Sequence, residues 1–297
     1  MNITISGGSG FIGRRLLKVL GDTGHNLHVL SRHAGSNMPN GVKLSVWDLH
    51  GPPPRVSIEN ADVVIHLAGE PVGQRWTAAA RRRILESRVE GTRRMVEALA
   101  ECRGRRPVLL SASAVGYYGS RGEELLDEAS PPGEGFLPEV CLAWEREAQA
   151  AAALGIRVAV VRIGVVLDPR GGALSRMLPP YRLGVGGPLG SGEQWMPWVH
   201  LSDLAELFRF LAENPIAGVF NGVAPFPVIN REFTRELARA LHRPAWFPVP
   251  RLALKALFGQ MSEVLLASQR IIPRAADAAG FRFQFPQLGP ALADLLK

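Results

Sequence analysis

Short apolar runs alternate along the first half of the chain with longer stretches in which apolar residues recur every three or four positions. The short runs predict buried strands, whereas the longer stretches predict helices with one apolar face. We expect strands over residues 2–6, 26–30, 42–46, 62–66, 108–111 and 156–162, and helices over residues 11–23, 77–102 and 138–154. This alternation is typical of an α/β protein whose doubly wound parallel sheet is covered by helices on both faces, the Rossmann arrangement.

The pattern changes after about residue 164. Glycine and proline become frequent, and helical patterns return over residues 201–213, 230–241, 251–258, 262–268 and 288–296. We therefore expect a nucleotide-binding domain over residues 1–165 and a smaller, mostly helical substrate lobe over residues 166–297. Ligands of such folds bind beyond the carboxyl ends of the parallel strands, so this lobe should cover that edge of the sheet.

Composition narrows the class of protein. At 297 residues, 46% of them hydrophobic, the chain can bury a large core, yet no apolar run is long enough to cross a bilayer. The first residues already read as a strand, without the basic segment that opens a secretory signal. Cys102 and Cys141 match neither a metal-binding nor a disulfide pattern. We expect a cytoplasmic protein without a metal site or a membrane partner.

The net charge of +7 comes almost wholly from arginine, and ten arginines fall between residues 75 and 106. Glutamates are interleaved with them, a mixture typical of a solvated helix face with ion pairs one turn apart. A nucleic-acid surface would be expected to carry interleaved aromatic residues or a known docking motif. We expect no nucleic-acid partner, whereas the same positive field favours an anionic cofactor or substrate.

A glycine-rich turn follows the first predicted strand directly. Gly7, Gly10 and Gly13 stand three residues apart, and a helical pattern continues after them. Such a turn lets the backbone approach a pyrophosphate closely, and the following helix directs its N-terminus at the negative charge. A tight turn that only packs a strand against a helix is the alternative. The place of the turn after an N-terminal β-branched strand favours dinucleotide binding.

The end of the second predicted strand bears on the choice of cofactor. Ser31 and Arg32 stand where a dinucleotide fold meets the adenosine ribose, and no carboxylate occupies positions 30–36. An acidic residue here would bind a free 2′-hydroxyl, whereas an arginine pairs with a 2′-phosphate. NADP(H) is therefore favoured over NAD(H), with a merely exposed arginine as the alternative.

Two later strands end in residues that suit the same crevice. Small residues in the segment Leu67-Ala68-Gly69-Glu70 would let the backbone lie along a cofactor, although a tight turn explains the glycine equally well. Ser113 ends a central strand four residues before Tyr117, so both hydroxyls could bind a substrate oxygen beside a nicotinamide. A hydroxyl-rich turn with packed aromatic rings is the alternative.

Four motifs together resemble the extended branch of the short-chain dehydrogenase/reductase superfamily: the glycine turn, Leu67-Ala68-Gly69, Ser113 before Tyr117-Tyr118-Gly119, and Trp198-Val199-His200-Leu201-Ser202-Asp203. More narrowly, the chain resembles the atypical group of NAD-dependent epimerase/dehydratase-like proteins called epimerase family proteins, also described as cell-division-inhibitor-like. This likeness is carried by Ala68-Gly69-Glu70, Ser87-Arg88, Trp144-Glu145 and segments 161–167, 186–192, 197–200, 221–225, 272–274 and 285–289. In that group the tail, here from about residue 245, forms a C-terminal domain of unknown role.

The resemblance implies a Rossmann fold that binds NADP(H). It places the pyrophosphate at Gly7, Gly10, Phe11, Ile12 and Gly13, and the 2′-phosphate at Ser31 and Arg32. It also places Leu67, Ala68, Gly69, Glu70 and Arg88 along the dinucleotide, and Val165 and Val166 near the nicotinamide. Ser113 matches the catalytic serine or threonine of the superfamily.

The chain departs from the superfamily at its usual catalytic pair, a helical tyrosine followed four residues later by a lysine that lowers the tyrosine pKa. None of its three tyrosines has a lysine at that spacing, and the helix where the pair belongs reads Val-Cys-Leu-Ala-Trp-Glu over residues 140–145. The candidate substitutes, each with a packing or structural role as its alternative, are Tyr117, which we place first, Cys141, Glu145 and His200.

Two functions stay open. The first is an NADP(H)-dependent oxidoreductase or epimerase-like enzyme acting on a small substrate, with nucleotide-linked molecules among the candidates and with Ser113 and Tyr117 as catalytic residues. The second is a non-catalytic NADPH-binding sensor that acts through a partner, which the missing tyrosine–lysine pair favours. Either a monomer or a homodimer is compatible with the arginine-rich helix.

Overall fold

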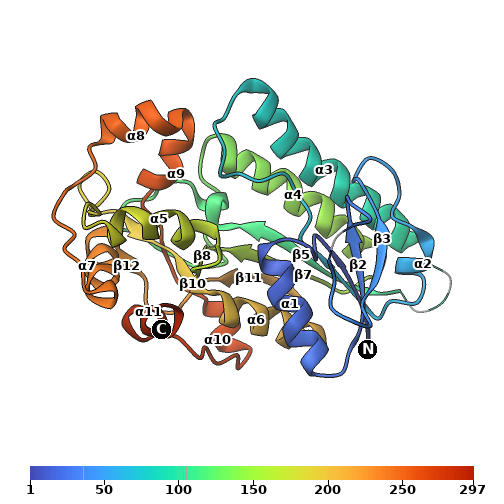
Figure 1. Ribbon diagram of the computed structural model, residues 1–297. Coiled ribbons are helices and arrows are strands. Elements are labelled where there is room, and N and C mark those ends of the chain that lie inside the picture. Colours follow the sequence, from blue (N-terminus) through green and yellow to red (C-terminus); the bar gives the residue numbers. More distant parts are fainter. Residues whose placement is uncertain (36, 103, 105) are drawn as a thin grey trace.

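The computed structural model (Figure 1) describes residues 1–35, 37–102, 104 and 106–297, so Arg103 and Arg105 of the arginine-rich stretch lie outside the described residues. Its centre is a seven-stranded parallel sheet with the strand order β11-β7-β5-β4-β1-β2-β3. The strands are β1 (Asn2–Ser6), β2 (Asn26–Ser31), β3 (Lys43–Val46), β4 (Val63–His66), β5 (Val108–Ala114), β7 (Val158–Ile163) and β11 (Gly218–Gly222). The predicted Rossmann-type sheet is confirmed, with its order reversing beside β1.

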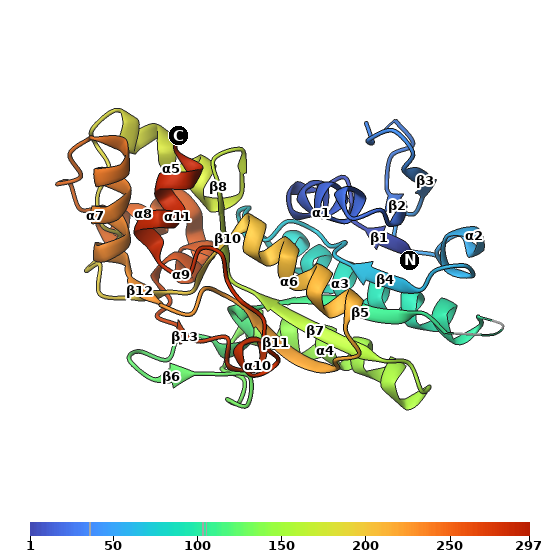
Figure 2. The same cartoon turned by 90° about the horizontal axis from the view of Figure 1, so that it is seen from below.

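Helices cover both faces of this sheet, as Figure 2 shows from below. One face carries α1 (Phe11–Asp22) and α6 (Leu201–Glu213), and the other carries α2 (Arg55–Ile58), α3 (Ala78–Ala100) and α4 (Phe136–Ala153). Strand β4 contributes to both layers, because Val63 and Ile65 belong to the first core and Val64 to the second. A strand buried on both faces needs a continuous apolar run, which made these segments recognisable in the sequence.

The smaller lobe has a third core and is mostly helical, as expected. Its helices are α5 (Gly172–Arg182), α7 (Asn230–Leu241), α8 (Arg251–Phe258), α9 (Ser262–Leu266) and α11 (Leu288–Leu295). Short strands pair as β8 (Val165–Asp168) with β10 (Trp198–His200), β9 (Trp195–Met196) with β12 (Val228–Ile229), and β6 (Leu125–Leu126) with β13 (Arg270–Ile271). The 3₁₀ turns η1 (Val115–Tyr118) and η2 (Gly259–Met261) and the helix α10 (Arg274–Ala278) complete the fold.

The chain returns to the main sheet after it has entered the lobe. Both α6 and β11 follow the predicted boundary at residue 165, yet they cover and extend the parallel sheet. Helix α10 also contributes Ala276 to the core beneath α1 and α6. The boundary itself stays a prediction, but the two parts share the sheet and its first helical layer.

The elements that were not predicted include helix α5 and strand β11, which were missed for different physical reasons. Helix α5 begins at Gly172 and contains Pro179 and Pro180, residues that usually indicate loops. Strand β11 begins and ends with glycine, which weakens the apolar pattern of a buried strand. By contrast, α6, α7 and α8 begin and end at the predicted residues. None of the described helices is both long and apolar enough to cross a membrane.

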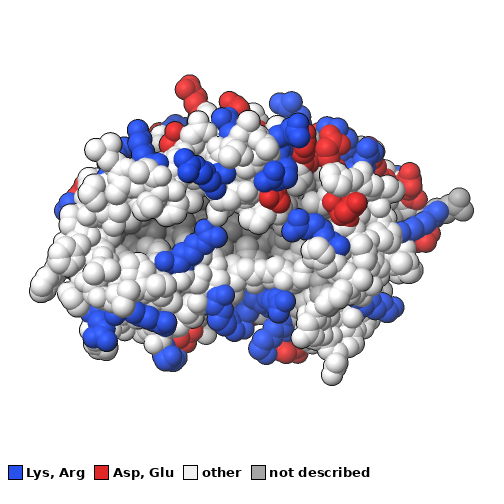
Figure 3. Space-filling model, turned by 45° about the horizontal axis from the view of Figure 1, so that its top comes forward, with Lys and Arg blue, Asp and Glu red and all other residues white. Residues whose placement is uncertain are grey.

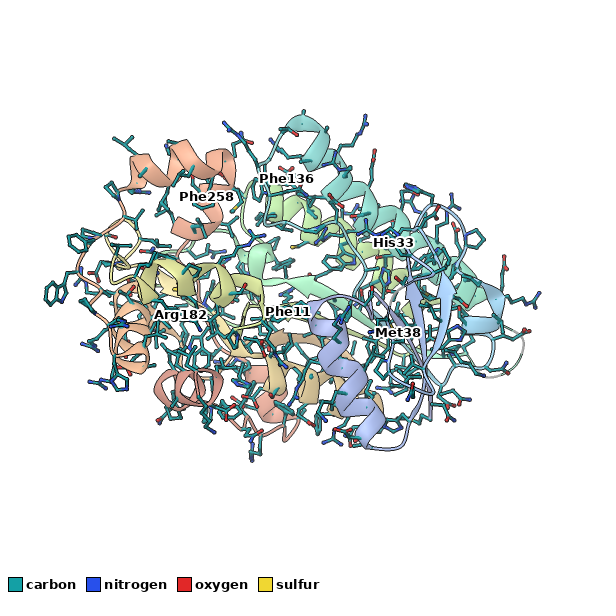
Figure 4. The ribbon with its side chains drawn as sticks, viewed as in Figure 1. Phe11, His33, Met38, Phe136, Arg182 and Phe258 are labelled. Carbon is teal, nitrogen blue, oxygen red and sulfur yellow. The ribbon has the colours of Figure 1, made fainter. Side chains whose placement is uncertain are left out.

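Both parts of the molecule border a hollow on one face. Figure 3 shows it running across the surface, with Lys and Arg side chains around it. In Figure 4, Phe11 lies near the middle of the molecule, Phe136 above it, Phe258 and Arg182 toward the left, and His33 toward β2. The strands β1, β2, β4 and β5 end in the residues that the sequence pointed to, so this hollow is the cleft expected at their carboxyl ends.

A buried histidine lies at the end of β4. The side chain of His66 is fully buried, its Nδ1 lies 2.6 Å from Ser6 Oγ, and its Nε2 has no hydrogen-bond partner among the described residues. Burial, assisted by the positive charge of Arg88, lowers the pKa of His66 to about 4. The imidazole is therefore neutral in the folded protein near neutral pH.

Replacing His66 should make the free energy of unfolding depend less on pH between pH 7 and 4. Between pH 6.5 and about 4, His66 is protonated in the unfolded chain but neutral in the folded protein. The free energy of unfolding therefore falls as the pH falls through this window. The shift corresponds to a contribution on the order of 3 kcal/mol. Urea titrations from pH 7 to 4 should give a smaller slope for His66→Gln than for the wild type or the exposed-site control His50→Gln. Equal slopes for all three proteins would contradict this account.

A pair of glycines in α1 tests the packing of the turn that precedes this helix. A Cβ atom on Gly13 would lie 2.6 Å from Gly8 Cα, whereas one on Gly21 would meet only Leu27 Cδ1 at 3.8 Å. Overpacking of this kind costs about 1–3 kcal/mol, so Gly13→Ala should lower the thermal midpoint clearly. Gly21→Ala should leave it unchanged or raise it. Equal thermal midpoints for the two variants would show that the turn can shift to accommodate a Cβ atom at position 13 without loss of stability.

Candidate active site

The glycine turn between β1 and α1 forms a cradle open to an anion. Gly7 has a φ of 73°, and a Cβ atom there would lie 3.0 Å from the backbone nitrogen of Ala68. Helix α1 begins after Gly10, and no described side chain caps its first turn. Its free N–H groups and the positive end of its dipole therefore suit a phosphate group.

The residues that follow Gly10 are held by both parts of the molecule. Ile12 packs against the core beneath α1, and a Cβ atom on Gly171 would lie 2.5 Å from the Phe11 ring. The loop between β8 and α5 therefore lies directly on Phe11. Because Gly171 and Gly172 have no side chains, this loop can approach the start of α1 closely.

Ser31, Arg32 and Glu70 meet at the other end of the cleft. Ser31 is buried with its Oγ 3.3 Å from Ser9 Oγ, whereas the Arg32 side chain is 60% exposed. The Arg32 Nη1 atom lies 4.0 Å from Glu70 Oε2, and Arg83 approaches the same carboxylate at 3.5 Å. A hydrogen bond from Gln74, followed by the charges of these arginines, lowers the pKa of Glu70. The exposed guanidinium of Arg32 is thus free to turn toward a ligand.

The end of β4 lies against Arg88, as the sequence suggested. Nη1 of Arg88 donates to the carbonyl oxygens of Glu70 and Ile84, at 2.9 and 3.1 Å, and its guanidinium lies over the Trp144 ring at 5.0 Å. A Cβ atom on Gly69 would approach the Arg88 guanidinium to 3.2 Å. Burial lowers the pKa of Arg88, and it forms no ion pair with a described carboxylate. The site therefore holds a cation close beneath the segment Leu67-Ala68-Gly69.

Ser113 belongs to a closed network of buried polar groups. Its Oγ donates to Glu145 Oε1 at 2.6 Å, and Arg162 binds both oxygens of the same carboxylate at 2.9 Å. The Arg162 Nη1 atom donates to the Tyr118 hydroxyl at 2.9 Å, and this hydroxyl donates to Asn221 Oδ1 at 2.7 Å. Five elements, β5, α4, β7, η1 and β11, thus contribute one polar group each.

Tyr117 lies beside this network rather than within it. Its ring lies under Arg162, whose Cζ is 3.4 Å from the ring centroid, and it packs edge-to-face on Tyr118 at 5.2 Å. Among the described residues its hydroxyl has no hydrogen-bond partner, whereas the Tyr118 hydroxyl is bonded to both Arg162 and Asn221. Ser113 and Tyr117 are therefore held by the same guanidinium, the first through Glu145 and the second through its ring.

Cys141 and His200, the other two candidates for the missing base, are both uncharged near neutral pH. Burial, and then the charge of Glu145, raise the pKa of Cys141 to about 12, so this thiol stays protonated. Burial lowers the pKa of His200 to about 4, and its Nδ1 accepts a hydrogen bond from Ser202 N at the start of α6. Cys141 is thus a buried thiol beside Ser113, and His200 is a helix cap.

Arg162 was quoted in a family motif but not assigned a role from the sequence. The signal was a charged side chain in the buried strand Val-Ala-Val-Val-Arg-Ile, at a position that must have a partner. Glu145, at a position on α4 that faces the sheet, is that partner. Although burial opposes the charge, Glu145 raises the pKa of Arg162, so the pair stays ionised.

Val165 and Val166 line the start of the smaller lobe. They pair in parallel with Trp198 and Val199 of β10, and Val165 N donates to the Pro197 carbonyl at 2.7 Å. Strand β8 follows β7 after Gly164 alone, which places Val165 close to the network around Ser113. Within the described residues, no group of His, Cys, Asp and Glu side chains is arranged to hold a metal ion.

The chain is similar to known proteins over its whole length. The model of the NAD dependent epimerase/dehydratase family matches residues 3–223, and that of a domain of unknown function, DUF1731, matches residues 249–295. Epimerase family protein YfhF of Bacillus subtilis is 38% identical over 100% of this chain and 98% of its own length.

Two solved structures are also similar. Human epimerase family protein SDR39U1, crystallised with NADPH, superposes with a TM-score of 0.89 at 36% identity, covering 100% of this chain and 99% of that protein. A nucleoside-diphosphate sugar epimerase from Corynebacterium glutamicum has a TM-score of 0.79 at 34% identity, with 100% of this chain and 58% of that protein covered. The chain therefore belongs to the NAD-dependent epimerase/dehydratase family, in which it groups with the epimerase family proteins.

Proposed function

We propose that this protein is a cytoplasmic NADPH-binding oxidoreductase that reduces a small anionic carbonyl compound. The observation that carries the proposal is the glycine cradle with its uncapped helix, which lies at the same edge of the parallel sheet as the exposed Arg32 after β2 and as Ser113 and Tyr117 at the end of β5. The human relative crystallised with NADPH supports the choice of cofactor.

Each group of residues in the cleft can be matched to one part of NADPH. Backbone N–H groups of Phe11 and Ile12 would hold the pyrophosphate, since no side chain at Gly7, Gly10 or Gly13 blocks the approach. Arg32, with Ser31 beside it, would pair with the 2′-phosphate. The segment Leu67-Ala68-Gly69-Glu70 would lie along the dinucleotide, with the cation of Arg88 behind it. Val165 and Val166 would border the nicotinamide.

The bound cofactor supplies the hydride, so the protein must orient and polarise the acceptor carbonyl and provide a proton. We assign the proton to the Tyr117 hydroxyl, which has no hydrogen-bond partner among the described residues and whose ring is held against the Arg162 guanidinium. Ser113, at the end of a central strand, would donate to the same oxygen by turning its single hydroxyl proton from Glu145 to the substrate. No strong base is needed for this half-reaction.

The preference for an anionic substrate rests on the walls of the cleft. Arg176 on α5 reaches across to the loop after β4, where its Nη1 donates to the Gly73 carbonyl at 2.9 Å. It forms no ion pair with a described carboxylate, so an incoming phosphate or carboxylate can replace the carbonyl as its partner. Nucleotide-linked molecules belong to this class, and the name of the Corynebacterium relative agrees with it.

A specific observation favours a second function, that of an NADPH sensor without turnover. The carboxylate of Glu145 is saturated by Arg162 and Ser113, so the site lacks a free base of the kind that the superfamily obtains from its tyrosine–lysine pair. Tight NADPH binding without cofactor oxidation across a broad panel of carbonyl compounds would support this alternative over the reductase.

Cofactor choice can be tested by reversing one charge. Arg32→Asp should weaken NADPH binding about 10- to 100-fold, because a charge-assisted contact to the 2′-phosphate is lost. NADH, which lacks this phosphate, should lose little. Calorimetric titration of both cofactors measures the difference, with Arg235→Asp on the exposed side of α7 as the charge-matched control. A similar loss for both cofactors would refute the assignment.

The catalytic assignment can be tested at constant cofactor affinity. Tyr117→Phe and Ser113→Ala should each lower the rate of NADPH oxidation with a carbonyl substrate about 100-fold or more, because each removes a group that stabilises the developing charge. Their NADPH dissociation constants should stay near that of the wild type. Ser111→Ala, which removes a buried hydroxyl from the same strand, is the matched control. Full activity in Tyr117→Phe would show that Tyr117 is not the proton donor.

A further inference from the structure

A second concave site lies along α1 and adjoins the glycine cradle at Phe11. Phe11, Arg14, Arg15 and Lys18 present one face of the helix to it, at the spacing of a single helical stripe. The opposite wall comes from Asp168 and Arg170 after β8 and from Leu201 at the start of α6. The cavity measures about 520 Å³, which is the size of a small-molecule site rather than a macromolecular surface.

The charge of this cavity is not balanced by its own side chains. Asp168 is paired with Arg170 through contacts of 2.8 and 3.0 Å, and Lys18 is paired with Asp22 at 2.8 Å outside the cavity. Arg14 donates only to the Ser9 carbonyl. Two guanidinium groups, those of Arg14 and Arg15, are therefore left without a carboxylate among the described residues.

Arg15 is the more informative of the two. Its Nη2 donates to the Ser202 hydroxyl at 2.9 Å, but its Nε is buried and has no hydrogen-bond partner among the described residues. A charged donor that lacks a partner leaves the Arg15 guanidinium incompletely neutralised. Since Arg15 lines the cavity, this unbalanced charge favours an anion there.

The backbone adds to this preference. Helices α1 and α6 lie side by side on one face of a parallel sheet, and both begin at this cavity, α1 at Phe11 and α6 at Leu201. The positive ends of two helix dipoles therefore contribute to the same field as the arginines. Phe11 and Leu201 supply an apolar wall beside the charged one.

We propose that this cavity, which we call the α1–α6 site, binds a small phosphorylated molecule, with its phosphate on Arg14 and Arg15 and its organic part against Phe11 and Leu201. The site shares Phe11 and the start of α1 with the glycine cradle, but Arg14 and Arg15 are not among the residues proposed to hold the cofactor, and its occupation does not depend on the proposed reductase activity. The loop Asp168–Gly172 lies on Phe11, so the two sites share one wall.

Calorimetric titration of the full chain with inorganic pyrophosphate tests the α1–α6 site directly. We expect saturable binding both in free protein and in protein saturated with NADPH. Arg15→Gln and Arg14→Gln should each weaken it about 10-fold or more, since each removes a charge-assisted contact. Arg235→Gln, on the far helix α7, should have no effect. Thermal unfolding of each variant checks that the fold is intact, and Arg14, being exposed, can be replaced without disturbing the core.

Three results would overturn the proposal: no saturable binding, binding that both arginine variants retain, or binding that NADPH abolishes. The last result would assign the pyrophosphate to the cofactor cleft. Because the titration of free protein needs no turnover and no cofactor, failure of the reductase hypothesis would leave its outcome unchanged.

Discussion

The candidate active site depends on one buried ion pair, between Glu145 on α4 and Arg162 on β7. Removing two charges from water costs several kcal/mol for each ion, and only complete hydrogen bonding offsets this cost. Here both carboxylate oxygens are bound by the guanidinium, and Ser113 and Tyr118 complete the bonding on either side. The pair therefore fixes the relative positions of a helix, two strands and a turn beneath the cleft.

This arrangement explains how the chain differs chemically from the superfamily it resembles. A lysine beside a tyrosine gives an unbalanced positive charge that helps the phenol lose its proton. Arg162 also lies over a tyrosine ring, that of Tyr117, but its charge is balanced by Glu145. The cation beside Tyr117 is therefore a paired one, unlike the lysine of the superfamily's catalytic pair.

Much of this protein could be predicted from its sequence because the relevant signals are local. The glycine turn, the apolar runs of the parallel strands and the boundaries of α6, α7 and α8 are set by nearby residues. Helix α5 was missed because Pro179 and Pro180 mask its pattern. The role of Arg162 was missed because its partners Glu145 and Tyr118 come from other elements, and only the folded chain brings them together. Long-range polar pairing is the information that periodicity does not contain.

The path of the chain between its two parts has a mechanical consequence. The polypeptide leaves the sheet after β7, builds β8, α5 and β10, and then comes back to supply α6 and β11 before leaving again. Genetic removal of everything after residue 165 would therefore strip the sheet of an edge strand and of half of one helical layer. Because the chain passes between the sheet and the smaller lobe several times, the lobe is not a separable domain. Any opening of the cleft must change the backbone conformation at several of these crossings at once.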